Sequence, residues 1–174
     1  MRALEFWKAV TVDRANLLES VIQLLNEHQM KYCVIGGQAV NAYAEPLVSL
    51  DLDLVIAARD LDRLAPYLRA QFIVEEFPHS LNVSIANSQL RVQIQRDPRY
   101  LDFPGRAERR EVLGLELPVA SPDDLLQGKI WAASDPEHRP TKRQKDTLDI
   151  ARLIEEYPRL RERVPTDLIK QIAS

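Results

Sequence analysis

The chain has little of several residue types, and each shortage narrows what it can be. One residue of 174 is cysteine and five are glycine. A single cysteine cannot form an internal disulfide, which is compatible with the cytosol. Cys33 falls in the apolar segment 32–35, so we expect a buried, inert thiol.

Long apolar runs and an excess of basic residues are also missing from the sequence. No stretch approaches the length of a membrane span, and the first residues lack the uninterrupted apolar core of a signal peptide. The net charge is −3, so no overall basic charge indicates nucleic-acid binding. We therefore predict a cytoplasmic protein that does not associate with a membrane.

Apolar residues are 45% of the chain, which is typical of a globular protein. Their spacing predicts alternating strands and helices. Expected helices are 13–29, 37–45, 59–70, 121–133, 141–156 and 166–172; expected strands are 32–35, 51–56, 72–76, 81–86 and 90–95, with a hairpin at 112–113 and 115–119 and a loop at 105–110. This order predicts an α/β (α+β) fold in which helices flank a mixed sheet.

The domain organisation follows from the same order of elements. An α/β domain would cover residues 1–120, and a helical C-terminal section, residues 121–174, would pack on it. Nothing rich in Gly and Ser separates the two parts, so a single domain is equally compatible with the sequence.

A glycine pair and a carboxylate pair suggest a phosphate and metal site. Gly36 and Gly37 interrupt the chain directly after strand 32–35, and bare backbone N–H groups at such a turn suit a phosphate. Asp51 and Asp53 alternate with leucines, so both project from one face of a strand. Two adjacent carboxylates repel each other unless a cation or proton lies between them. Magnesium, which takes carboxylate and phosphate oxygens, is the expected cation.

Together these motifs resemble the nucleotidyltransferase superfamily, and within it the AbiEii-like toxins of abortive-infection and toxin–antitoxin systems. The residues that carry the resemblance are Gly36, Gly37, Ala39, Val40, Ser49, Asp51 and Asp53, then Asp124-Leu125-Leu126 with Lys129, then Lys145-Asp146 with Asp149-Ile150. They extend over roughly residues 32 to 157.

The resemblance implies a magnesium-dependent transfer of a nucleoside monophosphate from a nucleoside triphosphate (NTP) to RNA, such as tRNA, or to a protein, with a cognate antitoxin as partner. Asp51 and Asp53 would be the catalytic metal ligands. Gly36 and Gly37 would hold the phosphates by their backbone.

Two further residues are assigned through the resemblance. Ser49 would hydrogen-bond a phosphate oxygen, or else cap the start of the strand. Lys129 would be a catalytic and phosphate-binding cation, or else an exposed helix lysine.

Two departures from the family pattern leave a second interpretation open. Many relatives place a third acid on a later strand, where this chain has Gln93 or Gln95, and an Arg where it has Leu47. Either Asp146 or Asp149 supplies the missing acid, or the protein is a non-catalytic nucleotide-binding or antitoxin-like partner. In the first case helix 141–157 must lie across the mouth of the sheet, Lys129 must face the same cleft, and a carboxylate there must have a raised pKa.

Two basic segments indicate an anionic partner. Arg139, Lys142, Arg143 and Lys145 gather at a helix start, where the helix dipole disfavours them. A solvated basic turn is the alternative. Arginines between 91 and 110 alternate with Tyr100 and Phe103, a mixture suited to single-stranded nucleic acid. We assign no role to His28, His79 or His138, because their spacing fits no metal site.

Overall fold

The computed structural model describes residues 2–10 and 16–173. Within them the helices are α1 (Ala3–Val10), α2 (Leu17–Glu27), α3 (Gly36–Asn41), α4 (Ala58–Gln71), α5 (Pro122–Ser134), α6 (Pro140–Glu156) and α7 (Thr166–Ala173). The strands are β1 (Tyr32–Ile35), β2 (Leu52–Ile56), β3 (Ile73–Phe77), β4 (Ser80–Ser84), β5 (Val92–Gln95), β6 (Glu108–Val112) and β7 (Leu115–Val119). Short 3-10 turns are η1 (Pro98–Tyr100), η2 (Phe103–Arg106) and η3 (Pro158–Arg163).

In the described part of the chain, the strands form one seven-stranded sheet in the order β3-β4-β5-β2-β1-β7-β6. β1 runs antiparallel to β2 and parallel to β7, and β2 runs parallel to β5. The sheet is therefore mixed. The predicted class, α/β with a mixed sheet and a helical C-terminal part, is confirmed.

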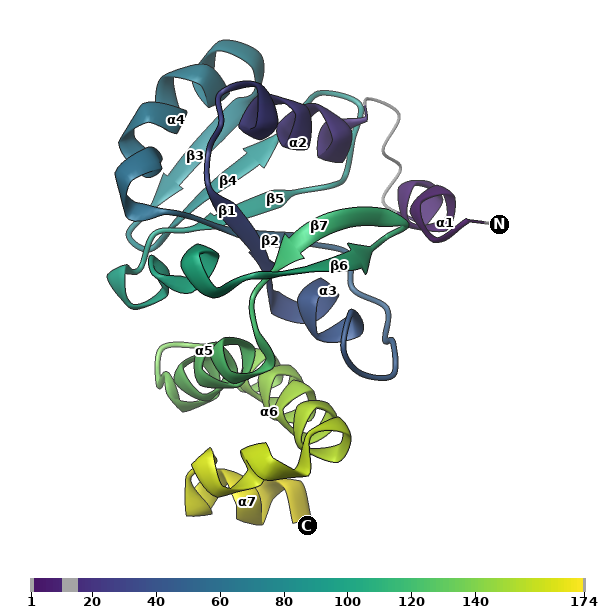
Figure 1. The fold of residues 1–174 in the computed structure, drawn as a ribbon, viewed down its shortest axis with the longest axis vertical. Coiled ribbons are helices and arrows are strands. Elements are labelled where there is room, and N and C mark those ends of the chain that lie inside the picture. The colour runs from purple at the N-terminus through teal and green to yellow at the C-terminus, as the bar shows by residue number, and fades with distance from the viewer. Residues whose placement is uncertain (1, 11–15, 174) are drawn as a thin grey trace.

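Helices cover both sides of the sheet (Figure 1). Figure 1 shows α2 and α4 on one side, and α5, α6 and α7 stacked at the other end of the molecule. The central strands are apolar and almost fully buried: all four residues of β1 and four of the five in β2 are buried. β1 and β2 are antiparallel, so the last residue of β1 lies beside the first residues of β2. Ile35 is therefore opposite Asp53.

Most predicted elements are present within one to three residues of their expected bounds, and the Ser121 N-cap is confirmed. Its hydroxyl accepts a hydrogen bond from the Asp124 N–H at 3.2 Å. Residues 13–15 of the predicted helix 13–29 lie outside the described residues. Helix α1 was not predicted.

Two local predictions were wrong. The helix expected at 37–45 ends at Asn41. Pro46 disfavours helical backbone at Glu45, and the Asn41 side chain bonds the Leu47 backbone in both directions, so the chain after Asn41 turns back on it. The expected loop at 105–110 instead contains the first residues of β6. β6 is an edge strand, and its exposed charged residues, typical of a protected edge, hide the strand pattern.

None of the described helices has both the length and the apolar character needed to cross a bilayer. The division of the chain at residue 120 stays a prediction.

Candidate active site

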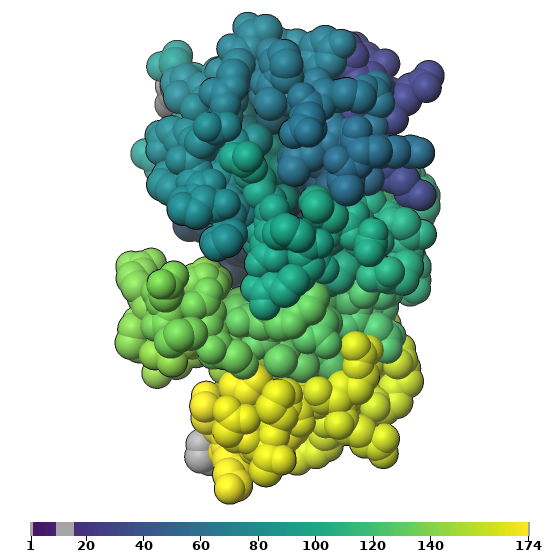
Figure 2. All heavy atoms as spheres, turned by 90° about the vertical axis from the view of Figure 1, so that its left-hand side faces the viewer, coloured from purple at the N-terminus to yellow at the C-terminus, as the bar shows by residue number. Residues whose placement is uncertain are grey.

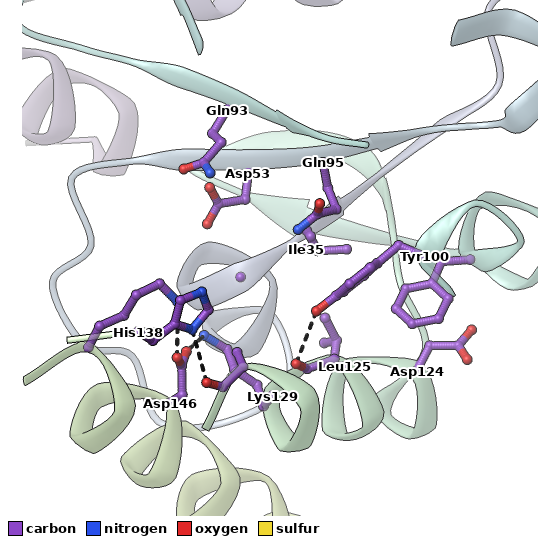
Figure 3. Close-up of a pocket in the computed structure, with 15 residues that line it drawn as sticks. Ile35, Asp53, Gln93, Gln95, Tyr100, Asp124, Leu125, Lys129, His138 and Asp146 are labelled. Carbon is purple, nitrogen blue, oxygen red and sulfur yellow. Dashed lines mark hydrogen bonds and ion pairs between the residues drawn. The ribbon is translucent and has the colours of Figure 1, made fainter. Parts of the chain in front are cut away.

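A cavity of about 160 Å³ lies between the sheet and helices α5 and α6. Figure 3 shows strand residues on its upper side and residues of the two helices below them. The lining residues are Ile35, Gly36, Asp53, Gln93, Gln95, Tyr100, Phe103, Asp124, Leu125, Gly128, Lys129, Ala132, His138, Lys142 and Asp146.

Asp53 extends from the middle of the sheet into this cavity (Figure 3). It lies opposite Ile35 on β1 and opposite Gln93 on β5. Gly36 follows Ile35 with a φ of +73°, a conformation that L side chains rarely adopt. Its backbone lies directly against the Asp53 carboxylate, because a Cβ atom there would be 2.2 Å from Oδ2. The first glycine and the second aspartate of the motif are thus brought into contact.

Gly37 and Ser49 form a second contact beside the first. A Cβ atom on Gly37 would lie 3.0 Å from the Ser49 Oγ atom. The Ser49 carbonyl accepts hydrogen bonds from Gln38 Nε2 at 2.6 Å and Trp7 Nε1 at 2.9 Å. Ser49 is therefore held at the glycine turn, beside the cavity rather than among its lining residues.

The two aspartates have different surroundings. The Asp51 side chain is 49% exposed, lies 3.6 Å from the Arg91 guanidinium and does not line the cavity. Burial raises the pKa of Asp53 to about 6, the Lys129 charge opposes this, and the Asp51 charge adds to it. The expected raised pKa is therefore found on Asp53, and the two carboxylates are close enough to influence each other.

The carboxylates in and beside the cavity could act as ligands of a divalent metal ion. The part of the chain that the structure describes contains no group of three or more His, Cys, Asp or Glu side chains placed to hold an ion. Two neighbouring carboxylates remain, one inside the cavity and one at its rim. This set fits magnesium, which is commonly held by one or two carboxylates and completed by substrate phosphates and water. Asp51 and Asp53 would hold it.

Lys129 is the centre of a buried ionic cluster. Its ammonium group lies 2.9 Å from Asp146 Oδ1 and 2.8 Å from Asp149 Oδ2. Lys142 binds the other Asp146 oxygen at 3.1 Å. Burial lowers the pKa of Lys129, but Asp149 and Asp146 outweigh it, and the net shift is upward. At 14% exposure, Lys129 is not the exposed helix lysine of the alternative interpretation.

The cluster continues through Arg152 to the segment that precedes the aspartates. Arg152 donates to Asp149 Oδ1 at 2.7 Å and twice to the Glu45 carbonyl, at 2.7 and 3.1 Å. It also bonds Asn41 Oδ1. Asn41 in turn bonds the Leu47 backbone through both N–H and C=O. A continuous polar path thus links the cavity lysine to residues 45–47.

The structure brings Gly36, Asp53, Lys129 and Asp146 into one cavity and leaves Gly37, Ser49 and Asp51 at its rim. Asp149 does not line the cavity, but it forms an ion pair with Lys129, which does. Helix α6 lies beneath the sheet near Asp53, as the missing-acid interpretation requires (Figure 3).

Sequence reasoning assigned no role to one cavity residue, His138. Its Nδ1 atom lies 3.0 Å from the Ala132 carbonyl, and its Nε2 atom lies 3.5 Å from Asp135 Oδ2. The residue sits in the turn before α6, and its only signal in the sequence is the neighbouring basic cluster. Gln95 and Tyr100 also line the cavity; the sequence indicates Gln95 only as a possible position of the missing acid and Tyr100 only as part of a basic and aromatic segment.

No protein-family model matches the chain, and no curated protein sequence matches it. Several solved structures do. A crystal structure of ANT(2'')-Ia in complex with adenylyl-2''-tobramycin has a TM-score of 0.55 and 15% identity, and the match covers 84% of this chain and 96% of that one.

Two other structures match over a similar share of the chain. An antigenic nucleotidyltransferase-like protein from Paracoccidioides brasiliensis has a TM-score of 0.54 and 19% identity over 83% of this chain and 77% of that one. The lincosamide antibiotic adenylyltransferase LnuA, lincomycin-bound, has a TM-score of 0.53 and 15% identity over 82% of this chain and 97% of that one. The chain therefore has the fold of the nucleotidyltransferases.

Proposed function

We propose that this protein is a magnesium-dependent nucleotidyltransferase that moves a nucleoside monophosphate from an NTP to RNA or protein. The observation that carries the proposal is the contact between the Gly36 turn and the Asp53 carboxylate at the edge of the cavity. A turn backbone that suits a phosphate thus lies beside a carboxylate that suits a metal ion, which supports the proposal.

The chemistry would use the chain's groups as follows. Asp51 and Asp53 would hold magnesium, and the bound ion would supply positive charge beside the phosphates. Backbone N–H groups at Gly36 and Gly37, with the Ser49 hydroxyl, orient the phosphate tail. Lys129 and Lys142 border the space beneath Asp53 and stabilise the negative charge that develops on the leaving pyrophosphate.

The biological setting is part of the same proposal. The likeness of the motifs to AbiEii-like toxins supports a toxin with RNA, including tRNA, or protein as target, and with a cognate antitoxin. The structural neighbours add a general precedent, because two of them are adenylyltransferases or carry an adenylylated product in their names. A cytoplasmic location stays a prediction.

A second candidate function rests on Gln93. This glutamine occupies the β5 position in register with Asp53, where many relatives carry a third acid. A site without that acid suits a non-catalytic nucleotide-binding or antitoxin-like partner on the same fold.

One experiment tests the proposal and separates the candidates. The protein is incubated with magnesium, α-labelled NTPs and either total RNA or cell lysate, and labelled product and pyrophosphate are measured. Labelling is expected in the wild type and in the control Asp167→Ala, which changes an exposed carboxylate on α7. It should be lost in Asp51→Ala/Asp53→Ala. Unchanged labelling in that double variant would falsify the metal assignment, and calorimetric NTP binding without pyrophosphate release supports the second candidate.

A further inference from the structure

We propose that the group accepting the nucleotide is a phosphate monoester, which is already an anion, rather than a neutral hydroxyl. This inference rests on the proposed nucleotidyl transfer and narrows its acceptor. It follows from the acid–base groups around Asp53 and from the charges at the start of α6.

The strand beside Asp53 offers no proton acceptor. Gln93 and Gln95 are the cavity-lining residues of β5, and Gln93 is the one in register with Asp53. A carboxamide does not take up a proton at neutral pH. The Gln95 oxygen is also occupied, since it accepts from the Arg96 and Asp97 N–H groups, each at 3.0 Å.

The other carboxylates of the cavity are already engaged. Asp146 uses one oxygen for Lys129 and the other for Lys142. Asp124 accepts two hydrogen bonds from the Arg106 guanidinium, at 2.9 and 3.1 Å. Taking a proton from a hydroxyl would require either carboxylate to give up a charge-assisted hydrogen bond.

With Asp53 assigned to the metal ion, His138 is the other group among the described lining residues that could act as a base. Its Nδ1 atom lies 3.0 Å from the Ala132 carbonyl, which can only accept, so Nδ1 is the donor of this hydrogen bond. The other nitrogen, Nε2, faces the Asp135 carboxylate at 3.5 Å. The two ring nitrogens thus face the Ala132 carbonyl of α5 and the Asp135 carboxylate that follows this helix.

The start of α6, which contributes Lys142 to the cavity lining, is instead rich in cations. Lys142 lines the cavity and its side chain is 47% exposed. Arg139 is the N-cap of α6, and Arg143 and Lys145 lie in its first two turns. None of the three makes an ion pair with any residue that the structure describes. Figure 2 shows the light-green residues near 140 standing beside a hollow under the blue and teal part of the molecule. An anionic acceptor that approached along the start of α6 would meet Lys142, which is paired with Asp146, and three cations that lie in no ion pair among the described residues.

The reaction balances without a base. An oxygen of the phosphate monoester attacks the α-phosphorus of the NTP and forms a new P–O bond. The bond from the α-phosphorus to the oxygen shared with the β-phosphate breaks, and its electron pair leaves with pyrophosphate. A monoester, whose second pKa is about 6, is mostly a dianion at neutral pH, so no proton has to be removed, and the product contains a phosphoanhydride. A hydroxyl acceptor would have to lose a proton in the same step.

Matched RNA oligonucleotides test the proposal directly. All have one sequence: one bears a 5′-phosphate and a 3′-deoxy end, one a 3′-phosphate and a 5′-hydroxyl, and one hydroxyls at both ends. Each oligonucleotide is incubated separately with magnesium and α-labelled NTPs. Ribose 5-phosphate, a small phosphate monoester, is tested as the acceptor in a further reaction. We expect transfer to a phosphate to be at least ~100-fold faster than transfer to the hydroxyl oligonucleotide. A general base usually contributes at least this factor, and the hydroxyl reaction would lack one. A nucleotide pyrophosphatase, which cleaves phosphoanhydride bonds within nucleotides, should remove the label from the product.

A gain of function provides the second arm. Gln93→Asp supplies a carboxylate beside Asp53, so it should raise transfer to the hydroxyl oligonucleotide by ~100-fold. Gln71→Asp, at the exposed end of α4, is the matched control and should not raise this transfer.

The acceptors also identify the source of the phosphate. Labelling of RNA but not of ribose 5-phosphate assigns the phosphate to an RNA end, and the reverse assigns it to a small molecule.

The outcomes that overturn the inference differ from those that overturn nucleotidyl transfer. Wild-type protein that labels the hydroxyl oligonucleotide as fast as the phosphorylated ones, and loses this in His138→Gln, would show that His138 is a base. The inference then fails while nucleotidyl transfer stands. Magnesium-dependent NTP binding with no transfer to any acceptor overturns both and favours the non-catalytic candidate.

Discussion

The backbone of Gly36 lies directly against the carboxylate of Asp53: a methyl group added to the glycine would come within 2.2 Å of Oδ2. The same glycine has a φ of +73°, where an L side chain costs about 1–2 kcal/mol. Glycine is needed at this position for two separate reasons, and one of them concerns the reactive group itself.

Gly36→Ala should therefore lower both stability and ligand binding. We expect a loss of about 1–2 kcal/mol in the free energy of unfolding from the backbone conformation. Displacement of the Asp53 carboxylate should weaken magnesium-dependent NTP binding by at least ~10-fold, or about 1.4 kcal/mol. Urea unfolding and calorimetry measure the two effects. Gly105→Ala is the control, because a Cβ atom there has no neighbour within 4 Å. Equal NTP binding by Gly36→Ala and wild type would contradict this account.

Asp53 should give the protein a distinctive dependence on pH. Burial raises its pKa from 3.8 to about 6, so between these values the folded protein binds more protons than the unfolded chain. Stability from this group is therefore highest below pH 4, falls as pH rises to 6, and stays constant above. In metal-free buffer, Asp53→Asn should raise the melting temperature at pH 7.5 more than at pH 4.

The comparison of Asp53→Asn with wild type removes the contribution of other titrating groups. The matched variant is Asp62→Asn, an exposed carboxylate on α4, which should show no such pH-dependent gain. Asp53→Asn that is equally stabilised, or destabilised, at both pH values would mean that burial does not disfavour the Asp53 charge.

The central strands and the first half of the site could be predicted from sequence because their signals are local. The apolar run 32–35, the glycine pair and the alternation at Asp51 and Asp53 each specify backbone and facing over a few residues. The strand at 32–35 was predicted at its observed bounds. The edge strand β6 was missed in part because its exposed, charged residues resemble a loop in sequence.

The second half of the site depends on contacts between distant segments. Lys129 could be selected only through the family resemblance, and its burial between Asp146 and Asp149 results from the packing of α5 on α6. Arg152 was not selected, since its partners Asn41 and Glu45 lie more than a hundred residues away. Spacing along one helix carries no information about such partners.

Removing the Lys129 charge should destabilise the packing of α5 on α6. Lys129→Met leaves Asp146 and Asp149 with one cation each, Lys142 and Arg152. We expect a loss of about 2–3 kcal/mol, less than the usual cost of breaking a buried ion pair because these cations remain. Urea unfolding measures it, and Lys145→Met, an exposed lysine of α6, should change stability by less than about 0.5 kcal/mol. A Lys129→Met protein as stable as wild type would show that the cluster contributes nothing to the fold.

The last prediction concerns the linking segment, residues 42–51, between α3 and β2. Tyr43 at its start is buried, but Leu47, Val48 and Leu50 are 45%, 75% and 48% exposed, so little burial holds residues 47–50 in place. Arg152 instead bonds the Glu45 carbonyl and Asn41, which bonds Leu47. The position of the segment before Asp51 therefore depends on a few hydrogen bonds.

Arg152→Met should release the linking segment while leaving the sheet intact. We expect backbone amides in 42–51 to exchange with solvent at least ~10-fold faster, which corresponds to losing about 1.4 kcal/mol of local protection. Arg152→Lys should restore it only in part, because an ammonium group lacks the planar fork that serves Asp149, Glu45 and Asn41 together. Hydrogen exchange followed by mass spectrometry measures both. Arg159→Met, which breaks an exposed ion pair to Asp123, should leave the segment unchanged. Equal exchange in Arg152→Met and wild type would mean that other contacts position the segment, and faster exchange throughout α4 as well would indicate general destabilisation in place of a local release.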